Sequence, residues 1–199
     1  LRRTTQLAAQ RPDLAFATLR GNVDTRLRKL DEGEYDAIVL AAAGLSRLGL
    51  LAGRPHHVLS REVCLPAVGQ GTLAIEGRAD DAGLRALLSE LEHTPTREVT
   101  EAERAFLMHL QGSCRVPIAG HAQLVDDGKR LSLQGLVGDI EGRQLLSAGS
   151  DVFLHGRDSN ARRAEAQALG VEVAEGLLAR GARELMAQAE ATIARQSNI

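Results

Sequence analysis

The part of the chain after residue 117 constrains the fold most, because three strand-like segments follow one another with tight turns between them. These segments are residues 119–125, 130–137 and 144–153. Asp126-Asp127-Gly128 separates the first two, and Asp139-Ile140-Glu141-Gly142 separates the last two, each with a glycine at a turn position. Sequential strands joined so tightly run antiparallel. We therefore expect a three-stranded antiparallel sheet here.

Helical patterns precede and follow this predicted sheet. The first runs from Thr94 to Gly112. Its apolar side chains recur at helical spacing and share one stripe: Val99, Ala102, Phe106 and Leu110. The second pattern covers residues 161–169 and 171–194, and three glycines are expected to interrupt it: Gly170, Gly176 and Gly181. Helices and sheet together predict a small α+β domain.

The first half of the chain alternates helical and strand-like segments. Residues 2–10 are predicted to be helical, and residues 14–19 and 37–41 are predicted to be strands. Between these strands we expect a helix that Asn22 caps and Gly33 ends. A strand, a helix and a strand within about 30 residues form a βαβ unit, which is typical of an α/β domain with a parallel sheet.

Residues 51–92 connect the two halves. Gly53, Pro55, Pro66 and Gly69 punctuate the first 20 of these residues, as expected of a crossing segment. One more strand is predicted at residues 72–75, and a helix at residues 80–91.

Charge and composition argue against several classes of protein. The longest apolar run, residues 37–45, is far shorter than the roughly 20 residues needed to cross a bilayer. Aromatic residues are only 2% and the formal net charge is −2, which speaks against a nucleic-acid-binding surface. Residues 1–30 nevertheless carry seven arginine or lysine residues against two aspartates, a local excess of five positive charges. This excess predicts a specific anionic ligand.

Two cysteines cannot form a disulfide framework, and neither has histidine or cysteine partners at metal-ligand spacing, so no metal site is predicted. Cys64, between Val63 and Leu65, is interpreted as a small buried apolar residue. Cys114 follows a predicted helix and precedes Pro117, on a loop where a nucleophile is both positioned and accessible. The histidines are interpreted as solvated or hydrogen-bonded side chains: His56, His57, His93, His109, His121 and His155.

The segment around Cys114 resembles a known signature. Residues 103–119, ERAFLMHLQGSCRVPIA, are similar to the cofactor-attachment motif of hydroxymethylbilane synthases (porphobilinogen deaminases). The resemblance continues, in the family's order, through LRRTTQLAAQRPDL, LRGNVDTRLRKLDEGEYDAIVLAAAGLSRLGL and LPAVGQGTLAIEGR. It implies a transferase that condenses four porphobilinogen molecules, with loss of ammonia, onto a dipyrromethane joined to the sulfur of Cys114. Hydrolysis then releases hydroxymethylbilane.

The resemblance also implies the binding residues. Arg2, Arg3, Arg20 and Arg26 would bind the carboxylates of the dipyrromethane, because the planar guanidinium matches a carboxylate. Arg20 and Arg26, together with Arg47, would bind the substrate. Gln70 is interpreted either as a hinge residue that contacts the cofactor or as a turn residue. The family's catalytic aspartate has no counterpart here and lies upstream, so these 199 residues alone are expected to be inactive.

Three parts are implied by the same resemblance. Residues 1–65 would be the remainder of a second α/β domain of the doubly wound, periplasmic-binding-protein-like type. Residues 66–92 would form a hinge and a segment that returns to a mostly missing first α/β domain, and residues 93–199 a C-terminal α+β domain. The protein would be a cytoplasmic monomer without nucleic-acid or membrane partners. The alternative is a non-catalytic carboxylate-binding module of periplasmic-binding-protein type, in which Cys114 is only structural.

Overall fold

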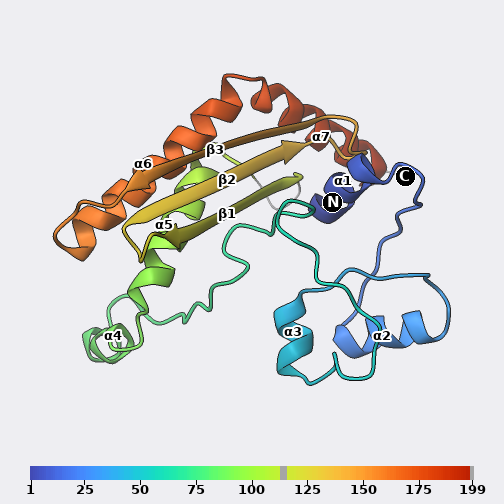
Figure 1. The fold of residues 1–199 in the computed structure, drawn as a ribbon, viewed down its shortest axis with the longest axis horizontal. Coiled ribbons are helices and arrows are strands. Elements are labelled where there is room, and N and C mark those ends of the chain that lie inside the picture. Colours follow the sequence, from blue (N-terminus) through green and yellow to red (C-terminus); the bar gives the residue numbers. More distant parts are fainter. Residues whose placement is uncertain (113–115, 198–199) are drawn as a thin grey trace.

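A computed structural model describes residues 1–112 and 116–197 of the chain (Figure 1). The first half contains four helices, and the second half contains a long helix, a sheet and two further helices. In chain order the elements are α1 (Arg2–Gln10), α2 (Val23–Asp31), α3 (Ala42–Arg47), α4 (Ala82–Ser89), α5 (Thr94–His109), β1 (Ile118–Val125), β2 (Arg130–Gly138), β3 (Leu145–Phe153), α6 (Ser159–Leu178) and α7 (Ala182–Ser197).

The predicted three-stranded antiparallel sheet is confirmed, with strand order β1-β2-β3. Ile118 lies opposite Val137, and Val125 lies opposite Arg130, so β1 and β2 pair along their whole length. The turn between them has positive φ at three consecutive residues, Asp126, Asp127 and Gly128. Aspartate and glycine tolerate this left-handed conformation better than most residues, which explains the turn sequence.

Helices α5 and α6 cover one face of the sheet and enclose the main hydrophobic core. Phe106 of α5 is fully buried, and its ring lies against Gly120 and Gly135, which are paired across β1 and β2. A Cβ atom on Gly135 would come within 2.5 Å of that ring. The paired glycines therefore leave the space that this aromatic ring occupies.

Helix α6 corrects one expectation, because it continues through Gly170 and Gly176 without interruption and the chain breaks only near Gly181. At Gly170 a Cβ atom would overlap the carbonyl oxygen of Ala102 and lie 2.8 Å from the Cβ atom of Ala105. This glycine therefore permits the close approach of α5 to α6. Tertiary packing overrides the weak helix propensity of glycine at this position.

The predicted helices in the first half are confirmed at residues 2–10, after Asn22, and within residues 80–91. The Asn22 side chain accepts a hydrogen bond from the backbone nitrogen of Thr25 at 2.8 Å, and Gly33 has a φ of 77° just after α2. Helix α5 begins at Thr94 as predicted, but it ends at His109 rather than at Gly112, because Gln111 already has a left-handed backbone conformation.

The strands predicted at residues 14–19, 37–41 and 72–75 are wrong for this structure, and so is the βαβ unit built on the first two. An extended segment becomes a strand only when a neighbouring segment pairs with its backbone N–H and C=O groups. No described segment pairs with these three. Their apolar side chains remain largely exposed, including Leu73 at 81% and Ile75 at 63%.

Candidate functional site

The strongest candidate from the sequence, Cys114, lies outside the described residues together with Ser113 and Arg115. The described residues on both sides of this gap are firmly packed, since Leu110 and Val116 are buried. A Cβ atom on Gly112 would overlap the Cδ1 atom of Ile118 and lie 3.0 Å from the Cδ1 atom of Leu107. Packing between the end of α5 and the start of β1 therefore accounts for the glycine of the Gly-Ser-Cys sequence.

Helix α1 lies at the same end of the sheet. The hydroxyl of Thr5 donates a hydrogen bond to the carbonyl oxygen of Asp139 at 2.7 Å, just after β2. A Cβ atom on Gly138 would overlap the Thr5 side chain, and the backbone nitrogen of Gly138 donates to the carbonyl oxygen of Pro117 at 3.0 Å. Helix α1 thus lies where the chain enters β1, directly after the segment that contains Cys114.

Arg2 and Arg3 begin this helix, and their two charges lie close enough to interact. Burial lowers the pKa of Arg2, and the neighbouring positive charge of Arg3 lowers this pKa further. The Nε atom of Arg2 is buried and has no hydrogen-bond partner among the described residues. Arg3 donates through Nη1 to the carbonyl oxygen of Val39 at 3.0 Å. A carboxylate would both satisfy the Arg2 donor and offset the two charges.

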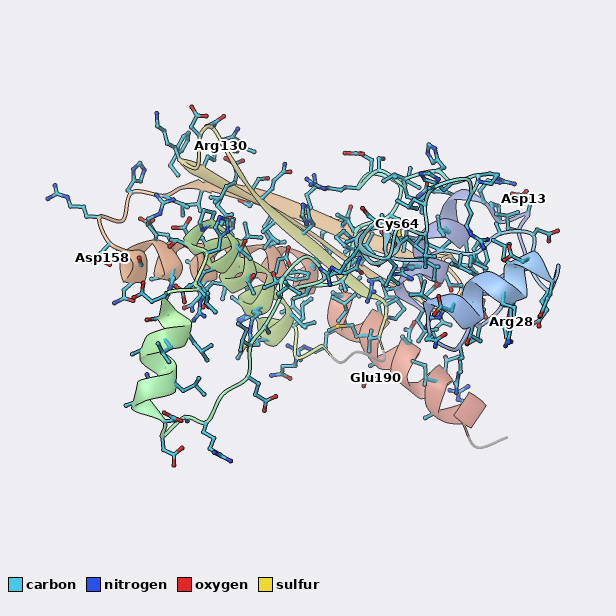
Figure 2. The ribbon with its side chains drawn as sticks, turned by 90° about the horizontal axis from the view of Figure 1, so that it is seen from below. Asp13, Arg28, Cys64, Arg130, Asp158 and Glu190 are labelled. Carbon is cyan, nitrogen blue, oxygen red and sulfur yellow. The ribbon has the colours of Figure 1, made fainter. Side chains whose placement is uncertain are left out.

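Cys64 lies beside α1, between the middle of the molecule and the end that carries Asp13 and Arg28 (Figure 2). Burial raises the pKa of its thiol, and the nearby charges of Arg3 and Arg2 oppose that shift only in part. The sulfur is half-buried, as a small apolar residue would be. A thiol with a raised pKa is a weak nucleophile at neutral pH, because little thiolate is present.

Residues 63–70, which we call the strap, connect α1 to the sheet. Gln6 binds the backbone of Leu65 in both directions: its Nε2 atom donates to the carbonyl oxygen at 3.1 Å, and its Oε1 atom accepts from the nitrogen at 2.8 Å. Gln10 donates to the carbonyl oxygen of Val63 at 2.7 Å. Further along, the carbonyl oxygen of Pro66 accepts from the nitrogen of Gly120 in β1 at 3.2 Å.

Gln70 ends the strap on an exposed turn, where its Oε1 atom accepts from the nitrogen of Ala67 at 3.4 Å. The preceding residue, Gly69, donates its backbone N–H to the Oε2 atom of Glu103 at 2.6 Å. Glu103 is 5% exposed, and its Oε1 atom accepts from the nitrogen of Ala122 at 2.8 Å. Glu103 therefore joins the turn that carries Gln70 to both α5 and β1.

The other predicted arginines lie farther along the first half. Arg20 is exposed just before Gly21, and no strand precedes it, contrary to our expectation. The Nε atom of Arg26, in the first half of α2, donates to the carbonyl oxygen of Gly21 at 2.8 Å. Arg47 is exposed at the end of α3. Figure 1 shows α2 and α3 together below α1, away from the sheet. The structure thus brings Arg2 and Arg3 together, but not with Arg20, Arg26 or Arg47.

The sequence did not single out Thr5, Gln6 or Glu103 as functional, although all three are buried polar residues that hold the site together. A signal existed for Glu103, since it lies four residues after Val99 and three residues before Phe106, on the same apolar stripe. A charged residue on a buried helix stripe requires specific partners. For Thr5 and Gln6 the sequence contains no comparable signal, because their partners are backbone groups distant in the sequence.

The described residues form neither a metal cluster nor a membrane-spanning helix. Within residues 1–112 and 116–197, no group of three or more histidine, cysteine, aspartate or glutamate side chains is placed to hold a metal ion. None of the described helices is long and apolar enough to span a membrane.

Comparison with known proteins shows which family the chain resembles. The family model described as "Porphobilinogen deaminase, dipyromethane cofactor binding domain" matches residues 1–86, and "Porphobilinogen deaminase, C-terminal domain" matches residues 97–179. Proteins named porphobilinogen deaminase from Nitratidesulfovibrio vulgaris strains Miyazaki F and Hildenborough are each 52% identical over 94% of this chain. A protein of the same name from Brevibacillus brevis is 46% identical over 94% of the chain.

The chain belongs to the porphobilinogen deaminase family, as the resemblance in its sequence predicted. It spans only 57% of the length of the Miyazaki F and Brevibacillus relatives and 56% of the Hildenborough relative.

Proposed function

We propose that this chain forms the cofactor-attachment part of a hydroxymethylbilane synthase, with a dipyrromethane joined to the sulfur of Cys114. One observation supports this most directly. The helix that begins with Arg2 and Arg3 is attached, through Thr5, to the end of the sheet at which the Cys114 segment enters β1. The helix that carries these two cations therefore lies near Val116 and Pro117, the described residues that follow the proposed attachment point in the chain.

The residues in this region suit an acidic oligopyrrole. A buried Nε donor without a partner, as in Arg2, has the chemistry to bind a carboxylate. Arg3 has further donors besides the Nη1 atom that binds Val39. We assign the cofactor carboxylates to these two residues together with Arg20 and Arg26, and the substrate carboxylates to Arg20, Arg26 and Arg47. Gln70 is assigned to the cofactor from the end of the strap.

When bound, the dipyrromethane supplies a nucleophilic pyrrole carbon to which porphobilinogen units are added. The tasks of this chain are to bind and orient. Fixed guanidinium groups neutralise the carboxylates and hold the growing chain in place, which lowers the entropic cost of each addition. The proton transfers require a carboxylate that we place outside these 199 residues, so the isolated chain is expected to have no deaminase activity.

The unpaired apolar segments suggest how the first half is completed. We infer that residues 14–19, 37–41 and 72–75 acquire strand partners in the full-length protein, within doubly wound α/β domains of periplasmic-binding-protein type. Residues 1–65 would then belong to a second α/β domain, residues 66–92 to the hinge and a segment returning to the first, and residues 93–199 to the C-terminal domain. A monomeric state and a cytoplasmic location complete the proposal.

Intact-mass measurement of the full-length protein tests this proposal, together with an assay of porphobilinogen consumption. The expected mass exceeds that of the polypeptide by two linked pyrrole units. Cys114→Ser should abolish both the added mass and the turnover, whereas the matched variant Cys64→Ser should retain both. If the protein makes bilane with an unmodified Cys114, the attachment is wrong. If it carries no adduct and has no turnover but binds small carboxylates, it is a binding module instead.

A further inference from the structure

The structure places an unusual buried charge at Glu103, in the middle of α5. Both carboxylate oxygens accept hydrogen bonds from backbone nitrogens, of Gly69 at 2.6 Å and of Ala122 at 2.8 Å. No arginine or lysine among the described residues forms an ion pair with this carboxylate, and the nearest cationic candidate is His121, whose Nδ1 atom lies 3.6 Å from Oε1. Glu103 thus joins three separate segments by one side chain.

Packing alone does not explain a carboxylate at this position, because burying it costs hydration free energy. Glu103 occupies the apolar stripe of α5, where an aliphatic side chain would fill the space without the loss of hydration that a buried charge incurs. What an aliphatic residue cannot do is accept the N–H of Gly69 and thereby fix the strap. Hydrogen bonds to an ionised acceptor are short and strong, as the 2.6 Å distance reflects.

The strap is held on both sides of the segment that leads to Gln70, the residue assigned to the cofactor. Gln6 holds one end of the strap at Leu65, and Glu103 holds the other end at Gly69, immediately before Gln70. Just beyond, the hydroxyl of Thr72 contacts the hydroxyl of Thr100 at 2.8 Å, again on α5. Gln70 is therefore bracketed by two contacts to the helix that leads to Gly112 and the Cys114 segment.

We propose that Glu103 is a positioning residue: by joining the strap to α5 and β1, it holds Gln70 at the place where this side chain meets the cofactor. This inference depends on the proposed function, because it assigns Glu103 a task in that site. Glu103 itself touches neither the cofactor nor the substrate and acts only through the strap.

A double-mutant cycle in the full-length protein tests the inference, with kcat for porphobilinogen consumption as the measurement. In Glu103→Gln the amide oxygen can accept only one of the two N–H groups and the NH2 group faces the other, so the joint between the strap at Gly69 and β1 at Ala122 is broken. We expect kcat to fall by about 10-fold to 100-fold, the range associated with misplacing a site by about 1 Å. Gln70→Ala should lower kcat in the wild-type protein and have much less effect in Glu103→Gln, because residues acting as one unit are not additive.

Glu98→Gln is the matched control. Glu98 lies on the same helix, is 3% exposed and binds Arg162 at 2.5 and 3.0 Å rather than the strap. This variant should lose stability with kcat unchanged. A second measurement, amide hydrogen exchange, should show faster exchange in residues 66–71 of Glu103→Gln but not of Glu98→Gln. If Glu103→Gln does not fold, Glu103→Asp, which keeps the charge but shortens the reach, enters the same cycle.

Three results would overturn the inference. The first is an additive cycle, in which the kcat losses of Glu103→Gln and Gln70→Ala multiply in the double variant. The others are a wild-type kcat in Gln70→Ala, or an unchanged rate of amide hydrogen exchange in the strap of Glu103→Gln. These results are separable from failure of the proposed function. Wild-type protein that lacks both turnover and an adduct on Cys114 defeats the proposed function itself. An active wild-type protein with an additive cycle defeats only the role of Glu103.

Discussion

The same substitution at two positions of α6 should have opposite effects on stability. Gly170 is buried against α5, whereas Gly176 is exposed and a Cβ atom there would meet only the Cβ atom of Ala148, at 3.7 Å. Replacing a helix-interior glycine by alanine stabilises a protein by about 0.5–1 kcal/mol when the new methyl group has room. Gly176→Ala should therefore raise the free energy of unfolding by about that amount.

At Gly170 the methyl group has no room. Its distance of 2.8 Å from the Cβ atom of Ala105 is about 1 Å shorter than an ordinary carbon–carbon contact, and it also overlaps the backbone oxygen of Ala102. Backbone cannot move aside as a flexible side chain can, so α5 and α6 would have to separate. Overpacking of this kind costs about 1–3 kcal/mol, and after subtracting the propensity gain we expect a net loss of about 1–2 kcal/mol for Gly170→Ala.

Urea unfolding of the two full-length variants measures the difference. The gap of about 1.5–3 kcal/mol between them corresponds to roughly 1 M in the midpoint concentration, with the slope unchanged. Equal stabilisation in both variants would refute the reasoning, because it would mean that α5 and α6 are not in close contact at Gly170. Equal destabilisation would also refute it, because glycine would then be required at both positions for another reason.

Three further outcomes are expected. Gly112→Ala should reduce cofactor attachment at Cys114, measured by intact mass. Adding Ile118→Val to this variant should restore attachment, because it removes the Cδ1 methyl group that the new Cβ atom would overlap. A double variant that still lacks the cofactor would contradict the steric explanation. Cys64 should react with iodoacetamide more slowly than a free cysteine, because burial raises the pKa of its thiol and disfavours the thiolate. Its reaction rate should still rise at pH values where the rate of an ordinary thiol has levelled off. A rate in the folded protein equal to the rate in the urea-unfolded protein would contradict this. Arg162→Leu should lower the free energy of unfolding by about 2–3 kcal/mol, because it leaves the buried carboxylate of Glu98 without its cation. The loss should be somewhat smaller than for a fully buried pair, since the arginine side chain is 26% exposed. An unchanged urea midpoint would show that Glu98 needs no cation.

Local patterns predicted the second half of the chain well. The turns at residues 126–128 and 139–142 determined an antiparallel sheet, and the stripe that includes Phe106 identified the face of α5 that enters the core. These features can be predicted from the sequence because each depends on residues that are close together in it. The prediction that Gly170 interrupts a helix was wrong for the opposite reason. This glycine allows close contact with α5, about 65 residues earlier in the chain, and no local pattern reveals that contact.

The candidate site divides in the same way. Its chemistry was predicted from the motif around Cys114, and the family comparison supports that motif. The placement of Arg2 and Arg3 near the start of β1 could not be predicted, because it depends on the bond from Thr5 to the backbone after β2. The role of Glu103 was equally hidden, since both of its partners are backbone nitrogens that any residue could supply.

By itself, then, the sequence determined the family and those helices and turns whose signals lie within a few residues, and it predicted Cys114 as the reactive sulfur. It also marked residues 14–19, 37–41 and 72–75 as apolar and extended, but whether they become strands depends on pairing partners that local sequence does not specify. Only the tertiary structure decided that α1, which begins with Arg2 and Arg3, packs against the end of the sheet, and how the strap is held. Those decisions depend on hydrogen bonds between distant segments, and a backbone N–H or C=O group is the same whichever residue carries it.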